Sequence, residues 1–290
     1  MMIPLRNTSV SSCPAFVLAG TLTVLVGLFS FVAQTVDASQ SVTVTDEAGV
    51  PQELTATETA WGTFKVGSWI RTRTTTITFQ EKIAQNIAES TTTLEAVEPD
   101  GILLKQVASV EIGGQTVQGE PQLKKIDFYQ QSPAGHGTVQ TLPPEEIPIG
   151  NRTFLCGVRV YEQTTSQSRR RTKVWFNPKV APYVLRVETT RTSLPTPEQP
   201  TEKPLGYSTS VVLNPPRTTL RGSLFGTYKI QTMRQHADGT VISLTNCSLQ
   251  VPGWVESERT WEYDREKKLI RIQTTVSSGV TTNEEIENRK

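Results

Sequence analysis

The side chains that most often carry out chemistry in proteins are few in this sequence and lie far apart. His136 sits in a Gly-His-Gly loop and His236 near a predicted hairpin turn, so the two imidazoles have no metal-ligand spacing. Cys156 and Cys247 form no Cys-x-x-Cys pair. A lone histidine in a glycine-rich loop is either a ligand or, more often, simply solvated. We therefore predict no metal site and no cofactor.

Sequence patterns for nucleophilic catalysis and phosphate binding are missing as well. The chain contains no Gly-x-Ser-x-Gly, and Gly113-Gly114 lacks the lysine that a phosphate-binding loop requires. The paired acids Glu145-Glu146 and Glu284-Glu285 fall in polar segments where solvated carboxylates are expected. A cysteine nucleophile would need a nearby base and a lowered pKa, and neither is visible. We predict no catalytic residue and a protein that is not an enzyme.

Cys156 and Cys247 are also candidates for a disulfide bond. If the chain is exported and loses its N-terminus, these are the two cysteines that remain. An even cysteine count in an oxidising compartment predicts a disulfide between them, which would stabilise the fold by up to a few kcal/mol. Two free buried thiols are the alternative.

Tryptophan is the residue type that best suggests a ligand. Trp69, Trp175, Trp254 and Trp261 fall on predicted strands. If several of them face one concave surface, they would line an apolar binding site, and otherwise they pack a closed core. We predict these four as the lining of a site for a lipid or another apolar ligand.

The strongest charge cluster combines Arg169-Arg170-Arg171 with Lys173. It predicts either contact with an anionic surface or a hairpin turn kept soluble by its charges. The whole chain carries 29 Lys+Arg against 28 Asp+Glu, a net charge of +1. Because no extended basic field results, we expect no nucleic-acid partner.

The N-terminus has the features of an export signal. Arg6 precedes an uncharged apolar stretch over residues 16–36, and Val36-Asp37-Ala38 offers small or short residues for cleavage after Ala38. The stretch is also long enough to span a bilayer. Residues 1–38 are thus predicted to be a signal peptide or an N-terminal membrane anchor (a transmembrane helix), with the body outside in either case. The Ser/Thr/Glu-rich residues 39–60 are predicted to be a flexible leader.

The body, residues 61–280, is predicted to be a single all-β, mainly antiparallel domain, followed by a disordered tail at 281–290. Threonine-rich runs favour strands, because a β-branched residue with a polar tip suits the solvent face of a sheet. Residues 69–79, 87–97 and 102–112 read as a meander with a turn at Pro99-Asp100-Gly101. A short helix over 80–89 is the competing interpretation. Residues 113–150, rich in proline, are expected to be an irregular excursion.

Two segments repeat a layout of strand, turn, strand, proline-containing kink and strand, at 151–193 and 221–264. Asn177–Tyr183 in the first corresponds to Cys247–Gly253 in the second, with an aromatic residue at or just after the end. Proline fits a strand start or a bulge but not the middle of a ladder, so each kink is expected to re-aim the chain. The two segments are either a structural duplication or ordinary hairpins that look alike.

The first of these segments also carries a resemblance. Arg159-Val160-Tyr161, followed by the run from Thr172 to Pro182, resembles uncharacterised secreted bacterial β-sheet proteins, which are similar in outline to periplasmic lipoprotein-carrier-like half-barrels. The resemblance covers about residues 157–263 and implies a large curved sheet or open half-barrel with irregular proline-rich loops. It implies an apolar ligand or acyl chain on the concave face, and no site residue carries over. The lipoprotein cysteine and the long helices of such carriers are missing here.

Two hypotheses about function follow. The first is an exported, periplasmic or extracellular, non-enzymatic binding or scaffold domain that holds an apolar ligand on a concave sheet face. The second is a structural cell-envelope protein that the uncleaved N-terminal segment anchors in the membrane. A co-purified lipid would favour the first hypothesis.

Overall fold

The structure is a computed structural model that describes residues 53–79, 83–112, 115–131, 137–196, 200–215 and 226–281. The chain divides into two units, Met1–Ser39 and Gln40–Lys290, and every described residue belongs to the second. The predicted export segment and His136 therefore lie outside the described residues. Within these ranges, no helix has the length and the apolar character that crossing a bilayer would require.

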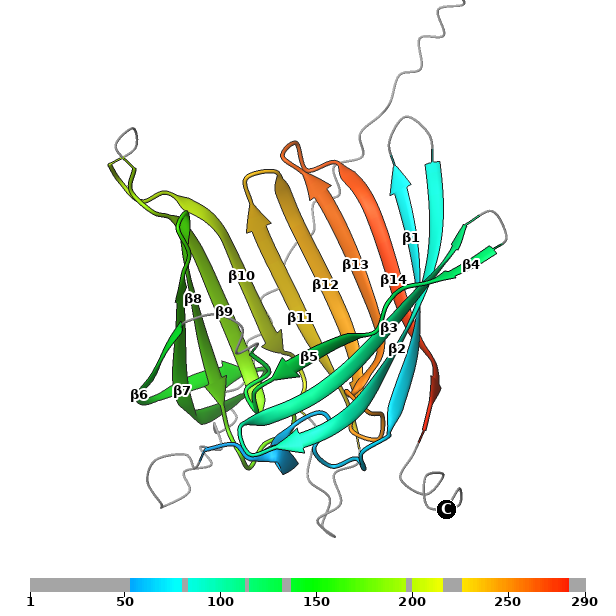
Figure 1. Ribbon diagram of the computed structural model, residues 1–290. Helices are drawn as coiled ribbons and strands as arrows, with labels where there is room; N and C mark the ends of the chain where they lie inside the picture. Colours follow the sequence, from blue (N-terminus) through cyan, green and yellow to red (C-terminus); the bar gives the residue numbers. More distant parts are fainter. Residues whose placement is uncertain are drawn as a thin grey trace, which may run out of the picture. The chain divides into compact units, whose positions relative to one another are not determined.

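The described residues form one antiparallel sheet of 14 strands, which confirms the predicted all-β class (Figure 1). A single 3-10 turn, η1 (Ala56–Glu58), precedes the first strand. The strands are β1 (Trp69–Phe79), β2 (Ile83–Glu98), β3 (Gly101–Ile112), β4 (Gln115–Gln118), β5 (Gln122–Ile126), β6 (Gly137–Ile149), β7 (Arg152–Thr164), β8 (Ser168–Phe176), β9 (Val184–Ser193), β10 (Pro204–Val212), β11 (Thr227–His236), β12 (Gly239–Ser248), β13 (Val255–Asp264) and β14 (Leu269–Val280).

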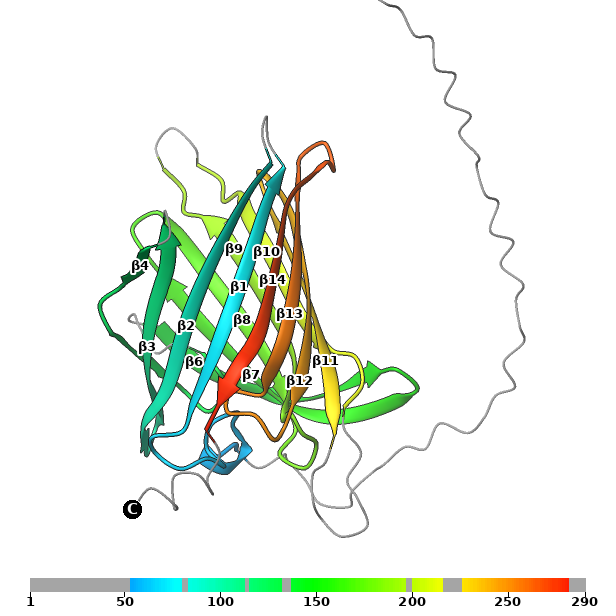
Figure 2. The same cartoon turned by 90° about the vertical axis from the view of Figure 1, so that its right-hand side faces the viewer.

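The strand order is β4-β3-β2-β1-β14-β13-β12-β11-β10-β9-β8-β7-β6, and β5 pairs with β3 beside β4. Along this order every strand pairs with its neighbour in sequence, except that β1 pairs with β14 and thereby joins the beginning of the sheet to its end. The sheet is curled, so that β2 and β3 face β8 and β9 across an inner space (Figures 1 and 2). It stays open, because β6 does not pair with β4 or β5.

The stretch 113–150 differs from the sequence-based expectation, since much of it is strand. β4 and β5 add to one edge, and β6 forms the other. Pro143 and Pro144 lie at a bulge between Leu142 and Glu145, where the ladder is already interrupted. Proline lacks a backbone N–H, so an edge strand accepts it and becomes a poor template for further pairing. The helical alternative for 80–89 is also wrong, because β2 begins at Ile83 and its residues 83–93 pair with β1.

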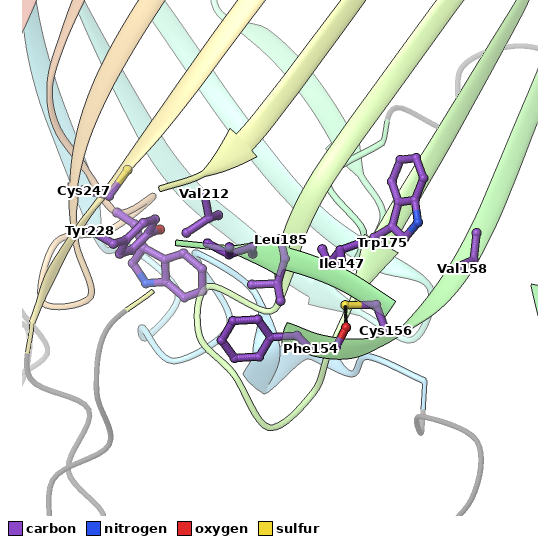
Figure 3. Packing of buried hydrophobic residues seen from close by; sticks show 11 residues of the cluster. Ile147, Phe154, Cys156, Val158, Trp175, Leu185, Val212, Tyr228 and Cys247 are labelled. Carbon is purple, nitrogen blue, oxygen red and sulfur yellow. Dashed lines mark hydrogen bonds between the residues drawn. The ribbon is translucent and has the colours of Figure 1, made fainter. Parts of the chain in front are cut away.

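The buried side chains gather where the β6–β7 hairpin and the ends of the central strands meet. Ile147 and Phe154 of the hairpin pack in one cluster with Val212, Tyr228 and further residues of β9 to β12 (Figure 3). Two smaller clusters continue this core. One surrounds Tyr129, Val174 and Phe176, and the other surrounds Trp61, Ile70, Leu94, Ile102 and Leu104.

Residues 53–60 fall in the segment predicted to be a flexible leader, yet they belong to this core. Leu54 is 4% exposed and its N–H donates to the phenol oxygen of Tyr129 at 3.2 Å. Glu58 accepts the backbone N–H of Thr55 at 2.8 Å, which closes a capping box around η1. The chain thus enters the domain before the predicted start at residue 61.

The two similar segments share a detailed backbone geometry at their kinks. The N–H of Asn177 donates to the carbonyl of Tyr183 at 2.7 Å, and the N–H of Ser248 donates to the carbonyl of Trp254 at 2.7 Å. Both aromatic residues have a positive φ, 69° for Tyr183 and 62° for Trp254, and their rings lie 5.9 Å apart. The kinks therefore turn the chain in the same way and meet in the core.

Candidate ligand-binding site on the inner face

The two faces of the curled sheet can be assigned from the strand register. Ile70 and Thr72 of β1 line a cavity inside the curl, so we call their side of the sheet the inner face. Side chains alternate along a strand, which places Arg71 and Arg73 on the outer face. Directly opposed residues share a face, and the pairings carry this assignment from β1 around the sheet to Thr172 of β8, which lines a second cavity inside the curl.

Hydroxyl groups pair repeatedly across the inner face. Thr74 and Thr275, for example, place their hydroxyl oxygens 2.9 Å apart. Each pair joins two neighbouring strands and leaves a polar, uncharged surface toward the inner space. The other pairs are Thr72–Ser90 at 3.1 Å, Thr172–Thr189 at 3.1 Å, Ser210–Thr232 at 2.8 Å and Ser243–Thr260 at 2.8 Å.

The first cavity, which we call the apolar cavity, has a volume of about 300 Å³. Its floor brings the indole of Trp61 against Gly253, where a Cβ would come within 3.0 Å of the ring. Gly253 also has a φ of 75°, so glycine is the residue that both the backbone and the ring allow there. The lining comprises Trp61, Ile70, Thr72, Ser90, Thr92, Leu104, Gln106, Lys124, Pro252, Gly253 and Val255.

The second cavity, which we call the polar cavity, has a volume of about 420 Å³. It lies between β5 with the connection that follows it and the strands β7 and β8. Its lining comprises Lys124, Ile126, Gln130, Gln131, Tyr161, Gln163, Arg170 and Thr172. Lys124 lines both cavities and is therefore the residue at which they adjoin.

Asp127 ties the two sides of the polar cavity together. Its carboxylate accepts the phenol O–H of Tyr161 at 2.6 Å and the backbone N–H groups of Tyr129 at 3.0 Å and Gln131 at 2.7 Å. Burial raises the pKa of Asp127, and these hydrogen bonds act against that rise. Because Asp127 follows β5 and Tyr161 belongs to β7, the neighbour of the edge strand β6, this contact joins the two end regions of the open sheet.

Basic residues differ between the two faces of β8. On the outer face, Arg171 pairs with Glu162 at 3.3 Å, and Lys173 with Glu145 at 2.7 Å. Arg169 likewise pairs with Glu202. Arg170 points into the polar cavity and pairs with no carboxylate among the described residues. The cluster predicted from the sequence is therefore divided between a neutralised outer part and an unneutralised inner part.

The four tryptophans predicted to line an apolar site do not line either cavity. Strand alternation places Trp69 and Trp261 on the outer face, because Ile70 and Thr260 face inward. Trp175 and Trp254 are buried in the large core cluster instead. These positions correct the predicted lining.

Trp61 is the tryptophan that lines the apolar cavity, and the sequence analysis did not select it. It precedes the first strand, so strand periodicity gave no signal for its orientation.

The side chain of Trp175 is held by contacts with polar residues on the outer face of the sheet. Its indole N–H donates to Glu145 at 2.8 Å, and Lys173 lies 4.6 Å from its ring centroid.

Cys156 and Cys247 are free, buried thiols, so the structure does not contain the predicted disulfide. They enter the same cluster from different sides (Figure 3): Cys156 donates to the carbonyl of Phe154 at 3.6 Å, and Cys247 lies opposite Tyr228. Burial raises the pKa of the Cys156 thiol to about 12 and that of Cys247 to about 11. Both thiols therefore stay protonated and unreactive at neutral pH.

The described residues also show where metal-binding side chains lie. His236 is exposed at the end of β11. Within the described ranges, no three His, Cys, Asp or Glu side chains come together in the way that a metal ion would need.

No protein-family model matches the chain, and no curated protein matches it. Among solved structures, the sheet is similar to a domain from Vibrio parahaemolyticus described as an outer membrane lipoprotein-sorting protein domain. The two chains are 12% identical, the TM-score is 0.30, and the match covers 74% of this chain and 85% of that one. A likeness with this TM-score supports no conclusion about the ligand of this chain.

Proposed function

We propose that the β domain is an exported, non-enzymatic binding module that holds an apolar chain, such as an acyl chain, on the inner face of its sheet. The apolar cavity carries this proposal. It combines a volume of about 300 Å³ with a lining of Trp61, Ile70, Leu104 and Val255. Small-molecule sites in proteins are concave and mostly apolar, with a few polar groups that orient the ligand.

The hydroxyl groups around the cavity support the same function. The hydroxyl oxygens of Thr72 and Ser90 lie 3.1 Å apart and satisfy one another, so this part of the wall is uncharged, and Lys124 is the one charged residue among the described residues of the lining. A chain of methylene groups that enters the cavity would leave water without breaking an ion pair of the protein. Each buried methylene stabilises binding by about 0.8 kcal/mol.

The direct test is equilibrium binding of 1-dodecanol, an uncharged long-chain alcohol, to the purified full chain, followed by the fluorescence of its tryptophans. Replacing Ser90 by phenylalanine fills the apolar cavity from its wall. Replacing Glu89, the preceding residue on the outer face, by phenylalanine adds the same bulk on the other side of β2. We expect Ser90→Phe to weaken dodecanol binding at least tenfold and Glu89→Phe to leave it unchanged.

Circular dichroism on both variants separates loss of binding from loss of folding. A folded Ser90→Phe variant that binds dodecanol as well as the parent chain does would contradict the assignment of the cavity. If the parent chain binds no dodecanol at all, the proposed function is wrong and a purely structural role is favoured.

A further inference from the structure

We propose that the polar cavity holds an anionic head group, so that the ligand of this domain is an amphiphile with a phosphate or carboxylate at one end. This inference rests on the proposed function, because it adds a head-group site to the apolar cavity. Three observations carry it: Lys124 has no carboxylate partner among the described residues, Arg170 has none there either, and Arg191 lies directly opposite Arg170.

Lys124 and Lys125 are neighbours on β5 with opposite surroundings. Lys125 pairs with Glu98 at 2.6 Å and with Asp100 at 2.7 Å. Lys124 faces the inner space, lines both cavities and has no carboxylate partner among the described residues. The ammonium group of Lys124 is therefore available where the two cavities adjoin.

Arg170 repeats this contrast on the opposite wall. Its outer-face neighbours Arg169 and Arg171 each pair with a glutamate, whereas the eight residues that line the polar cavity include no carboxylate. The lack of an acid is local to this cavity. Farther along the inner face, Arg271 pairs with Glu262 at 3.0 Å.

Arg191 of β9 lies directly opposite Arg170 in the register, so it shares the inner face. Like charges in direct cross-strand opposition destabilise a sheet. The Nε–H of Arg191 donates to the hydroxyl of Ser168 at 3.2 Å, and its remaining N–H groups have no carboxylate partner within the described ranges. An anion between the two guanidinium groups would replace this repulsion with charge-assisted hydrogen bonds.

The adjoining cavities determine the chemical class of the ligand. An anion bound by Lys124 and Arg170 occupies the polar cavity, and a chain attached to that anion can pass Lys124 into the apolar cavity. Phosphate and carboxylate both satisfy these donors. An uncharged chain would fill the apolar cavity and leave the cations unneutralised.

The test compares three probes on the full chain by isothermal titration calorimetry: 1-dodecanol, dodecyl phosphate and inorganic phosphate. The double variant Lys124→Gln/Arg170→Gln removes the inner cations. The matched control Lys125→Gln/Arg171→Gln removes two cations from the same strands, one residue along, on the outer face. We expect the parent chain to bind dodecyl phosphate at least about tenfold more tightly than dodecanol.

The inner double variant should lose that preference and keep its affinity for dodecanol, and the outer double variant should keep both affinities. Equal binding of dodecanol and dodecyl phosphate by the parent chain would overturn the head-group site and leave the proposed function intact. Binding of neither long-chain probe would refute the proposed function itself. Inorganic phosphate that binds as tightly as dodecyl phosphate would overturn the amphiphile, because the site would then recognise the free anion.

Discussion

The inner and outer faces of the sheet are built by the same strands but hold different kinds of side chain. Along β1 the inner residues Thr72 and Thr74 alternate with the outer residues Arg71 and Arg73. Curling brings side chains on the inner face closer together and spreads those on the outer face apart. Short hydroxyl residues therefore pair with one another along the inner face, which also holds the ion pair of Arg271 with Glu262.

This difference also separates stability from binding. Outer-face cations beside the polar cavity are neutralised by acids of the protein, as Lys173 is by Glu145. Lys124 and Arg170, the cations that line the polar cavity, have no carboxylate partner among the described residues, and Arg170 opposes Arg191. A protein that keeps unneutralised charge on the face that holds its cavities gives up some stability of the empty domain there, as binding sites commonly do.

The largest expected effect is on the free energy of unfolding, and it concerns a buried apolar residue of the inner face. Leu94 is fully buried on the inner side of β2, opposite Leu104. Leu94→Ala should lower the free energy of unfolding by about 2–5 kcal/mol, because it removes buried methyl groups and leaves a cavity. The measurement is urea unfolding followed by circular dichroism.

Glu95, the next residue, provides the matched outer control. It reaches Lys105 at 3.8 Å and both side chains are largely exposed, so Glu95→Ala should change the unfolding free energy by less than about 0.5 kcal/mol. Equal effects of the two substitutions would contradict the assignment of faces on β2.

The second prediction concerns an outer-face carboxylate. Glu145 accepts hydrogen bonds from Lys173 at 2.7 Å and from the indole of Trp175 at 2.8 Å. The bond from Lys173 holds the pKa of Glu145 below its ordinary value of 4.5. Glu145→Gln should therefore cost about 0.5–1 kcal/mol of unfolding free energy at pH 7, an amount limited by solvent exposure.

The pH dependence of this cost has a defined sign. A carboxyl group with a lowered folded-state pKa contributes stability above its unfolded pKa, and it loses that stability as the pH falls through the folded-state pKa. The difference between the parent chain and Glu145→Gln should thus be full above pH 4.5 and vanish in stronger acid. Thermal unfolding at a series of pH values measures it, and a constant difference would show that the charge of Glu145 has no part in the contact.

The third prediction is a substitution that stabilises the empty domain, whereas most substitutions destabilise a protein. Arg170→Gln removes one of two directly opposed arginines, so it should raise the unfolding free energy of the empty domain by about 0.2–1 kcal/mol. Arg171→Gln, which breaks the exposed pair with Glu162, should leave it unchanged or slightly lower. The gain should shrink at high salt, because screening weakens the repulsion. A loss of stability in Arg170→Gln would show that an acid neutralises this arginine.

The sequence was sufficient for the fold class and for most strands. The first strand was predicted with the bounds that β1 has, because its threonine-rich run follows Gly67-Ser68 and ends before the polar residues Gln80-Glu81-Lys82. The strands between 113 and 150 were missed, since prolines normally argue against a strand and the edge position that tolerates them depends on the completed sheet.

Much less of the candidate site could be predicted from the sequence. Periodicity separates the residues of a strand into two sets, but it does not say which set faces the inside of a curl. For this reason the sequence suggested that Trp69 and Trp261 line the ligand site, whereas the structure places both on the outer face. Lys124 could not be found, because β5, a short segment with two lysines and a glutamine, was not predicted as a strand and its pairing with β3 was therefore not expected.

The smallest expected effect tests the curvature of the sheet with uncharged residues alone. Thr74 and Thr275 oppose one another on the inner face with hydroxyl oxygens 2.9 Å apart, whereas Thr75 and Thr274 oppose one another on the outer face without a hydrogen bond between them. A double-mutant cycle with valine should give the inner pair a coupling energy of about 0.3 kcal/mol and the outer pair one near zero. Both pairs have the same residue types on the same two strands, and they differ in the face and in the backbone pairing, because successive opposed pairs of an antiparallel ladder alternate between hydrogen-bonded and non-hydrogen-bonded. Equal coupling energies would mean that the curl does not bring the inner side chains together, and the small hydroxyl residues of the inner face would then need another explanation.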